Sequence, residues 1–209
     1  MLMEKKEISP TARIAQNGMV EKDAKVILFD CFGLFATDSV NDFFKELFGA
    51  DFQKNKDRFC APADRGEIGF EELVKGIAGE YHLDPSSLYS RFIAERTVNQ
   101  EMIDFAKECR AKHHVYLLSN CIRGTIDEVF AGTDFALAFD GQFRSCDIGL
   151  VKPSPEIFAF VKQKLGSPKD IVFVDDNPLN VEAAKKAGIP GIVFTSLQQL
   201  RADLASYGY

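Results

Sequence analysis

The sequence has few of the residues that mark several common classes of protein. It contains no tryptophan, three histidines and five cysteines, and no two cysteines form a CxxC pair. The odd number and the spacing of the cysteines argue against a disulfide framework or a zinc site, and predict reduced thiols in a cytoplasmic protein. No apolar run reaches the roughly 18 residues that a membrane-spanning helix needs. We therefore expect a chain that neither crosses a membrane nor depends on disulfides.

The charge of the chain limits its partners. The net charge is −6, and no tract rich in lysine and arginine stands out. This acidic balance argues against nucleic acid or an anionic membrane as the main partner. Residues 1–24 are charged and lack the apolar core of a secretory signal, so we interpret them as a polar extension. Oligomeric state is left open by the sequence.

Five short apolar runs alternate with helical patterns over most of the chain. Short, β-rich runs without polar alternation are typical of strands buried on both faces. Strands that alternate with helices predict an α/β protein with a doubly wound, Rossmann-like parallel sheet. The expected strands are 26–30, 115–120, a weaker run at 135–141, 171–176 and 191–194; the expected helices are 101–112, one capped by Ser154 that begins at Pro155, and one from Pro178 to Gly188.

Residues 36–99 interrupt this alternation with helical spacing alone. Apolar side chains recur every three or four residues in 40–48, 70–77 and 88–92, which predicts three amphipathic helices. We interpret this block as an all-helical cap over the strand ends. The predicted organisation is an extension at 1–24, an α/β core of 25–35 and 100–209, and a cap at 36–99.

Polar side chains follow the predicted strands at the points where they end. These are Asp30, Ser119-Asn120 and Asp175-Asp176, and Lys152 lies in the loop before the helix that leads into the fourth strand. Ligands of open parallel sheets bind at the carboxyl ends of the strands. We therefore expect these side chains to form one site.

In their order along the chain, these elements resemble the haloacid dehalogenase-like hydrolase superfamily over roughly residues 25–195. The matching motifs are VILFD, LLSN, VKPSPEIF and FVDDNPLNVEAAKKAGI. DRGEIGFEEL at 64–73 also resembles the helical cap of the branch that contains small sugar-phosphate phosphatases and the N-terminal phosphatase domain of soluble epoxide hydrolases. The resemblance implies a phosphohydrolase that acts on a small phosphorylated metabolite, such as a sugar phosphate.

The resemblance also assigns roles to the site residues. It implies Asp30 as the nucleophile that forms an aspartyl-phosphate, and Lys152 as the cation that neutralises charge on Asp30 and the phosphoryl group. It implies phosphate binding by Ser119, Asn120 and Lys152. It further implies a magnesium ion held by Asp30, Asp176 and the backbone carbonyl of Phe32, with Asp175 acting through water. Such an oxygen-rich set suits magnesium.

Phe32 departs from the pattern of the family. Most phosphatases of the superfamily carry a second aspartate at this position, which protonates the leaving oxygen and then activates water. Losing a general acid or base typically costs about 10²–10⁴ in rate. A phosphate ester with a good leaving group would not need this acid, or the cap or the substrate could supply a replacement. The candidate residues are Asp38, Asp64 and Glu67.

The phenylalanine keeps two alternatives open. Haloacid dehalogenases resemble this chain in carrying an aromatic residue at that position and work without metal, but they have a serine/asparagine motif where this chain has Asp175-Asp176. The second alternative is a catalytically attenuated member that binds a phosphorylated metabolite or a protein partner. The acidic pair favours phosphate chemistry.

Overall fold

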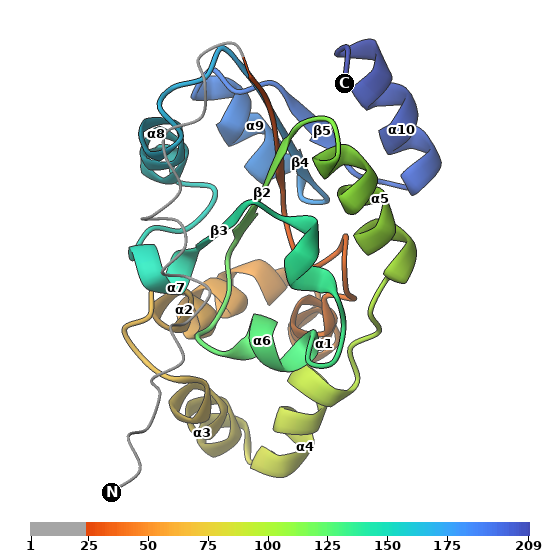
Figure 1. Cartoon of the computed structure of the whole chain (residues 1–209). Coiled ribbons are helices and arrows are strands. Elements are labelled where there is room, and N and C mark those ends of the chain that lie inside the picture. The colour runs from red at the N-terminus through yellow and green to blue at the C-terminus, as the bar shows by residue number, and fades with distance from the viewer. Residues whose placement is uncertain (1–23) are drawn as a thin grey trace, which may run out of the picture.

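The computed structural model describes residues 24–209, and a five-stranded parallel sheet lies at its centre (Figure 1). The strand order is β3-β2-β1-β4-β5, so the chain starts in the middle of the sheet and winds outwards in both directions. The sheet confirms the predicted doubly wound topology. The strands are β1 Lys25–Phe29, β2 His114–Ser119, β3 Gly141–Arg144, β4 Asp170–Asp175 and β5 Gly191–Val193.

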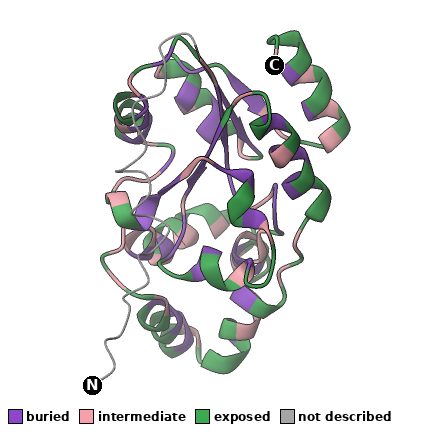
Figure 2. Ribbon diagram, in the orientation of Figure 1, coloured by how far each residue is buried: buried purple, intermediate pink, exposed green. Residues whose placement is uncertain are grey.

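Helices cover both faces of the sheet, so most strand residues are buried (Figure 2). Ile27 and Phe29 of β1 pack with α5 (Gln100–Arg110) and α10 (Leu197–Ser206). Val26 and Leu28 face the other way and pack with α8 (Pro155–Lys164) and α9 (Pro178–Lys186). These four of the five β1 side chains are completely buried, so the strand is fixed in position directly before Asp30.

The predicted helix starts are correct in position, although one cap works differently. Pro155 and Pro178 begin α8 and α9, and Gly188 follows α9 with a φ of 76°. Asn177 caps α9, since its side chain accepts a hydrogen bond from the backbone N–H of Leu179. Ser154 occupies the cap position of α8 without a capping hydrogen bond, because its hydroxyl bonds to the Glu156 carboxylate instead.

The expected strand at 135–141 is wrong. Phe135–Ala138 forms a short 3-10 helix, η4, and β3 begins only at Gly141. The rings of Phe135 and Phe139 each pack against Phe35, with centroids 5.4 Å apart, so this apolar run fills the core beside the sheet instead of joining it.

The chain between β1 and α5 is helical, which confirms the predicted all-helical insertion. Its buried side chains form a hydrophobic cluster of their own, including Phe44, Ile77 and Phe92. We call this segment the cap; its boundaries at 36 and 99 remain a prediction. The helices are α1 Ser39–Phe48, η2 Gly49–Asp51, α2 Phe52–Asp64, α3 Phe70–Tyr81, α4 Pro85–Tyr89 and the short π-helix η3 Ser90–Ala94.

The two chain segments that join the cap to the core lie side by side. Ala36 forms an antiparallel bridge with Val98, and the backbone N–H of Thr37 donates to the carbonyl of Thr97 over 3.1 Å. The cap therefore leaves and re-enters the core at one place, next to the carboxyl end of β1.

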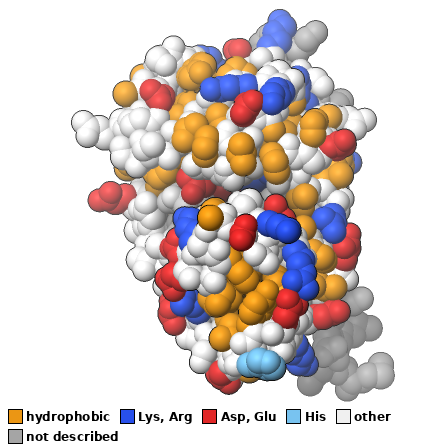
Figure 3. Space-filling model, turned by 180° about the vertical axis from the view of Figure 1, so that it is seen from behind, with side chains coloured by type: hydrophobic (Ala, Val, Ile, Leu, Met, Phe, Trp, Pro, Cys, Tyr) orange, Lys and Arg blue, Asp and Glu red, His pale blue; other side chains and the backbone are white. Residues whose placement is uncertain are grey.

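Residues 24–209 contain no helix that is long and apolar enough to cross a membrane. On the face shown in Figure 3, lysine and arginine side chains are interspersed with acidic ones and form no single basic surface. The remaining short helices are α6 Thr125–Val129 and α7 Ser145–Ile148. Of the N-terminal extension predicted at 1–24, residues 1–23 lie outside the described residues.

Candidate active site

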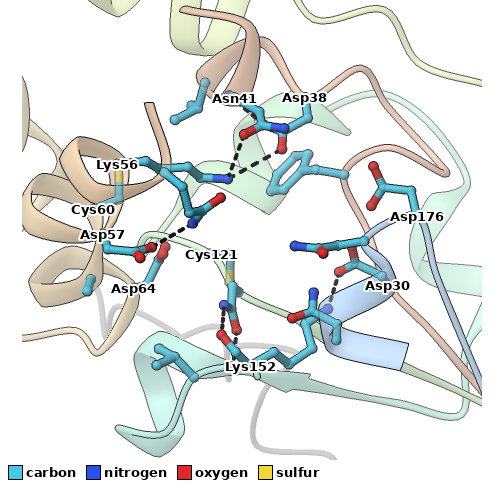
Figure 4. A pocket seen from close by; sticks show the side chains of 18 of the residues that line it. Asp30, Asp38, Asn41, Lys56, Asp57, Cys60, Asp64, Cys121, Lys152 and Asp176 are labelled. Carbon is cyan, nitrogen blue, oxygen red and sulfur yellow. Dashed lines mark hydrogen bonds and ion pairs between the residues drawn. The ribbon is translucent and has the colours of Figure 1, made fainter. Parts of the chain in front are cut away.

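A cavity of about 570 Å³ lies between the carboxyl ends of the strands and the cap (Figure 4). Asp30, Lys152 and Asp176 line it from the core, and Lys56 and Asp64 line it from the cap. The sequence predicted a site at this edge of the sheet, and Asp30, Lys152, Asp175 and Asp176 come together here.

Lys152 is bound between two carboxylates. Its Nζ lies 2.6 Å from Oδ1 of Asp30 and 2.7 Å from Oδ2 of Asp175, and the residue is only 4% exposed. Burial alone would lower the pKa of Lys152, but Asp175 and Asp30 raise it above its usual value. The ammonium group is therefore charged and fixed against Asp30.

Asp175 is completely buried and all its bonds are within the protein. Nδ2 of Asn180 donates to both carboxylate oxygens, at 3.1 and 3.0 Å, and the N–H of Asn177 donates to Oδ1 at 2.8 Å. With Lys152 on its other oxygen, Asp175 holds the lysine in place. This is the more direct role that the structure gives it, beside the predicted contact to a metal through water.

The loop after β2 is bonded to the loop that carries Lys152. The side-chain amide of Asn120 donates to the Lys152 carbonyl and accepts from the Lys152 N–H, both over 2.8 Å. Ser119 is completely buried, and its hydroxyl donates to the carbonyl of Asn120 over 3.2 Å. Phosphate binding by Ser119 and Asn120 stays a prediction, and these bonds bring both residues next to Lys152.

Three carboxylates converge beside the lysine. One oxygen from each of Asp30, Asp175 and Asp176 lies within 4.8 Å of the others. Burial and the charge of Asp175 raise the pKa of Asp30 to about 8 and that of Asp176 to about 6. One ammonium group does not balance three carboxylates, so a divalent cation would relieve their repulsion.

Gly33 leaves room for this carboxylate cluster. Its φ is 91°, and a Cβ at this position would lie 2.4 Å from Oδ2 of Asp176. Only glycine lets the backbone turn here and pass so close to the carboxylate. The carboxylate oxygens of Asp30, Asp175 and Asp176 are ligands of the kind that magnesium prefers.

Phe32 lies in the cavity wall, and the guanidinium of Arg96 stacks on it. The Arg96 Cζ is 3.8 Å from the ring centroid, and its Nε donates to the carbonyl of Phe92 over 2.6 Å. Within residues 24–209, Arg96 forms no ion pair with a carboxylate, and burial lowers its pKa. The position that holds an acid in most of the family thus holds an aromatic platform for a cation.

The cap wall of the cavity is formed largely by α2, a helix that the apolar spacing of the sequence does not predict. Its lining residues recur at helical spacing: Gln53, Lys56, Asp57, Cys60, Ala61 and Asp64. Most of these side chains are polar, so the inward face of α2 resembles a solvent-exposed face in the sequence. The signal that could have revealed the helix was the spacing of the polar residues, which is that of an α-helix.

The three acids considered as replacements differ in their surroundings. Glu67 is exposed and forms a 2.6 Å ion pair with Arg65. Asp38 caps α1 by accepting from the N–H of Asn41, and its other oxygen lies 3.6 Å from Nζ of Lys56. Asp64 lines the cavity, and burial raises its pKa to about 7.

The parallel sheet, the helical cap and the strand-end carboxylates with their lysine define an α/β protein with a charged cavity between sheet and cap. A family model for haloacid dehalogenase-like hydrolases matches residues 24–188. The chain therefore belongs to the haloacid dehalogenase-like hydrolases, as the motifs predicted.

Solved structures share this fold. A HAD family enzyme from Bacteroides thetaiotaomicron, in complex with magnesium and inorganic phosphate, superposes with a TM-score of 0.68 at 22% identity, covering 85% of this chain and 98% of the other. L-2-haloacid dehalogenase from Xanthobacter autotrophicus superposes with a TM-score of 0.60 at 22% identity, covering 88% and 83% of the two chains.

Curated relatives have several activities. D-ribitol-5-phosphate phosphatase of Bacteroides thetaiotaomicron is 32% identical over 142 residues, which cover 57% of this chain and 68% of the relative. Flavin mononucleotide hydrolase 1 of Arabidopsis thaliana is 40% identical over 67 residues, 32% of this chain and 27% of the relative. The match to the drimenol cyclase drtB of Aspergillus calidoustus spans only 29% of that protein, and the match to bifunctional epoxide hydrolase 2 of Rattus norvegicus spans 21%.

Proposed function

We propose that this protein is a magnesium-dependent phosphohydrolase whose nucleophile is Asp30. The observation that carries the proposal is the arrangement at the strand ends. Lys152 forms ion pairs with both Asp30 and Asp175, and the carboxylate of Asp176 lies beside them. A phosphate monoester is a dianion, and a carboxylate approaches it only where cations compensate the charge. Lys152 supplies one such cation, and the carboxylate cluster would hold the second.

In this proposal the residues divide the work between attack and binding. Asp30 attacks the phosphorus in line and forms an aspartyl-phosphate, which water then hydrolyses. Lys152 neutralises charge on Asp30 and on the phosphoryl group, while Ser119 and the amide of Asn120 bind phosphate oxygens. Asp30, Asp176 and the carbonyl of Phe32 would hold magnesium, which supplies charge neutralisation and orientation of the phosphoryl group.

The cap favours a small phosphorylated substrate with several hydroxyl groups. Side chains that donate and accept hydrogen bonds, among them Asn41, Gln53 and Lys56, line the cap wall of the 570 Å³ cavity. Covering these polar side chains with a bound substrate costs free energy unless the substrate forms hydrogen bonds with them, and hydroxyl groups can pair with both donors and acceptors. The similarity to a D-ribitol-5-phosphate phosphatase supports a sugar or polyol phosphate.

Phe32 favours a second candidate, a metal-independent 2-haloacid dehalogenase. Halide leaves without a proton, so this chemistry would not need an acid at position 32. However, Asp175 and Asp176 beside Asp30 would repel an anionic haloacid. We therefore propose the hydrolysis of a phosphate ester as the function, in preference to dehalogenation.

The proposal is tested with purified protein and a substrate panel, with magnesium and with a chelator. The panel contains sugar and polyol phosphates, an aryl phosphate and 2-haloacids, and phosphate and halide release are measured. We expect phosphate release that requires magnesium and is abolished by Asp30→Asn, a nearly isosteric change that removes the nucleophile. Halide release without metal would establish the dehalogenase instead. No turnover of any compound, with magnesium binding retained, would indicate an attenuated binding protein.

A further inference from the structure

We propose that Asp64, at the end of cap helix α2, gives the proton to the leaving oxygen and then activates the hydrolytic water. The inference rests on the proposed function, because it assumes phosphoryl transfer to Asp30. It assigns to the cap the catalytic role that the phenylalanine at position 32 cannot fill.

Asp64 and Asp30 line the same cavity from different sides. Asp64 lies with Asp57 on the α2 side, and Asp30 lies with Asp176 at the strand ends (Figure 4). A substrate whose phosphoryl group lies against Asp30 has the core on one side, so its leaving group extends towards the cap. A donor on the cap wall therefore faces the part of the substrate that needs a proton.

The chain at Asp64 is fixed against the core by a hydrogen-bonded link. The Ser145 hydroxyl donates to the Asp64 carbonyl over 2.6 Å and accepts from the Cys121 N–H over 3.0 Å. Cys121 directly follows Asn120, a predicted phosphate-binding residue. Asp64 is thereby tied to the loop that would bind the phosphoryl group.

Gly66 strengthens this attachment. Its φ is 73°, and a Cβ there would lie 2.2 Å from the carbonyl oxygen of Cys146. The cap backbone passes α7 at a distance that only glycine permits. Together with the Ser145 link, this contact holds Asp64 at a defined place beside the cavity.

The surroundings of Asp64 suit a group that both gives and takes a proton. The pKa of Asp64 is raised to about 7, mainly by burial. The charge of Lys56 opposes this rise, those of Asp38 and Asp57 add to it, and that of Lys152 opposes it. A catalytic acid works best with a pKa near the operating pH. Glu67, by contrast, is exposed and its pKa is lowered by the hydrogen bond from Arg65.

The proton is accounted for in both steps. As the bond from Asp30 to phosphorus forms and the bond to the leaving oxygen breaks, the Asp64 carboxylic acid protonates that oxygen and the alcohol leaves. The Asp64 carboxylate then takes a proton from the attacking water. The oxygen of that water bonds to phosphorus as the phosphorus–Asp30 bond breaks, so inorganic phosphate leaves and the Asp30 carboxylate is restored.

The test compares Asp64→Asn with the unaltered protein on two phosphate esters. The first is a polyol phosphate, whose alkoxide leaving group needs a proton, and the second is 4-nitrophenyl phosphate, whose phenolate does not. We expect kcat/KM for the polyol phosphate to fall by about 10²–10⁴. With the aryl ester we expect a burst of about one nitrophenolate per enzyme, followed by slow turnover, because the aspartyl-phosphate accumulates without a base.

Two controls exclude a structural explanation. Glu67→Gln removes a carboxylate from the same segment and should keep the original kinetics on both esters. Because the raised pKa of Asp64 means that the folded state binds its proton more tightly, stability should fall as the pH rises from about 4 to about 7. Asp64→Asn removes this loss, so its melting temperature should exceed that of the original protein at about pH 8 but not at about pH 4.

The outcomes separate the two proposals. A burst with lost polyol-phosphate turnover, in a variant that melts no lower, supports Asp64 as the proton donor. Equal effects on both esters without a burst, or no effect on either, would overturn that role while Asp30-dependent phosphate release still supports the phosphohydrolase. If the original protein releases no phosphate from either ester, the proposed function itself fails.

Discussion

At the scale of single residues, Phe32 does more than leave the site without an acid, because its ring supports the guanidinium of Arg96. The ring supports the guanidinium at 3.8 Å, and Arg96 also bonds to the carbonyl of Phe92 in the cap. Cation–π contacts of this kind stabilise by about 0.5–2 kcal/mol, depending on desolvation. The residue at position 32 therefore contributes to packing between core and cap, which an aspartate there would change.

This contact affects the attempt to restore the acid with Phe32→Asp. The new carboxylate would lie beside the Arg96 guanidinium and pair with it, which lowers its pKa and removes its proton near neutral pH. In the Asp64→Asn background, we expect Phe32→Asp alone to recover little polyol-phosphate turnover. Adding Arg96→Gln should recover more, as measured by kcat/KM.

The control for this series is Arg96→Gln with Asp64→Asn, which should recover nothing because it introduces no acid. Full recovery by Phe32→Asp without the change at Arg96 would contradict the pairing. Melting temperatures of all variants show whether each remains folded.

At the scale of helices and strands, prediction succeeded for strands that are buried on both faces; it failed for the apolar run at 135–141, which packs beside the sheet as a 3-10 helix, and for segments whose environment is polar. β1 and β4 are buried on both faces and appear in the sequence as continuous apolar runs. β3 escaped prediction because it is an edge strand whose buried polar residues, Gln142 and Arg144, bond to each other and, through Arg144, to Asp127. Hydropathy cannot identify a strand that is buried through hydrogen bonds and an ion pair.

The same reasoning applies to the site. Asp30 and Asp175 were predicted at one site because each stands at the end of a buried strand, and Lys152 because of the motif VKPSPEIF before a helix. In the structure, Nζ of Lys152 lies 2.6 Å from Asp30 and 2.7 Å from Asp175. The polar face of α2 was missed because a helix that faces a cavity has the composition of one that faces water. Asp64 was considered only as one acid among three, since its burial depends on contacts between cap and core.

The turn after β1 gives a prediction at this scale. Gly33→Ala should lower magnesium affinity by about 10–100-fold, since the added methyl group would displace the Asp176 carboxylate. Calorimetric titration with magnesium measures the change. The variant should also melt at a lower temperature, because alanine is strained at a φ of 91°.

A matched glycine in the cap serves as the control. Gly76 is exposed within α3, and a Cβ there would contact nothing within 4 Å. Gly76→Ala should raise stability by about 0.5–1 kcal/mol through helix propensity and leave magnesium affinity unchanged. If both substitutions affect magnesium alike, the account of Gly33 is wrong.

At the scale of the whole molecule, the described residues have three hydrophobic clusters, one on each face of the sheet and one inside the cap. Among the hydrophobic side chains of the cap cluster, Ile122 and Val129 come from the core side, and the cap also contacts α7 at Asp64 and Gly66. Units with separate cores open at different free energies. We therefore expect the cap to open without unfolding of the sheet.

Native-state hydrogen exchange tests this expectation. Amides of β1 and β4 should exchange slowest, through global unfolding, and those of α1 and α3 should exchange faster. Phosphate with magnesium should slow exchange in α2 and in the segments around Thr37 and Thr97. Identical opening free energies for cap and sheet would contradict two separately cooperative units.

The paired segments at Ala36–Val98 and Thr37–Thr97 also have an evolutionary consequence. The chain leaves the core for the cap and returns to it at neighbouring points, so the cap is joined to the core as a long surface loop would be. The entropic cost of closing such a loop rises only slowly with its length. Natural recombination could thus replace the whole cap, and with it substrate choice, while the sheet and Asp30 stay as they are. In this protein such an exchange would also remove Asp64, the proposed proton donor, so substrate choice and proton transfer would change together.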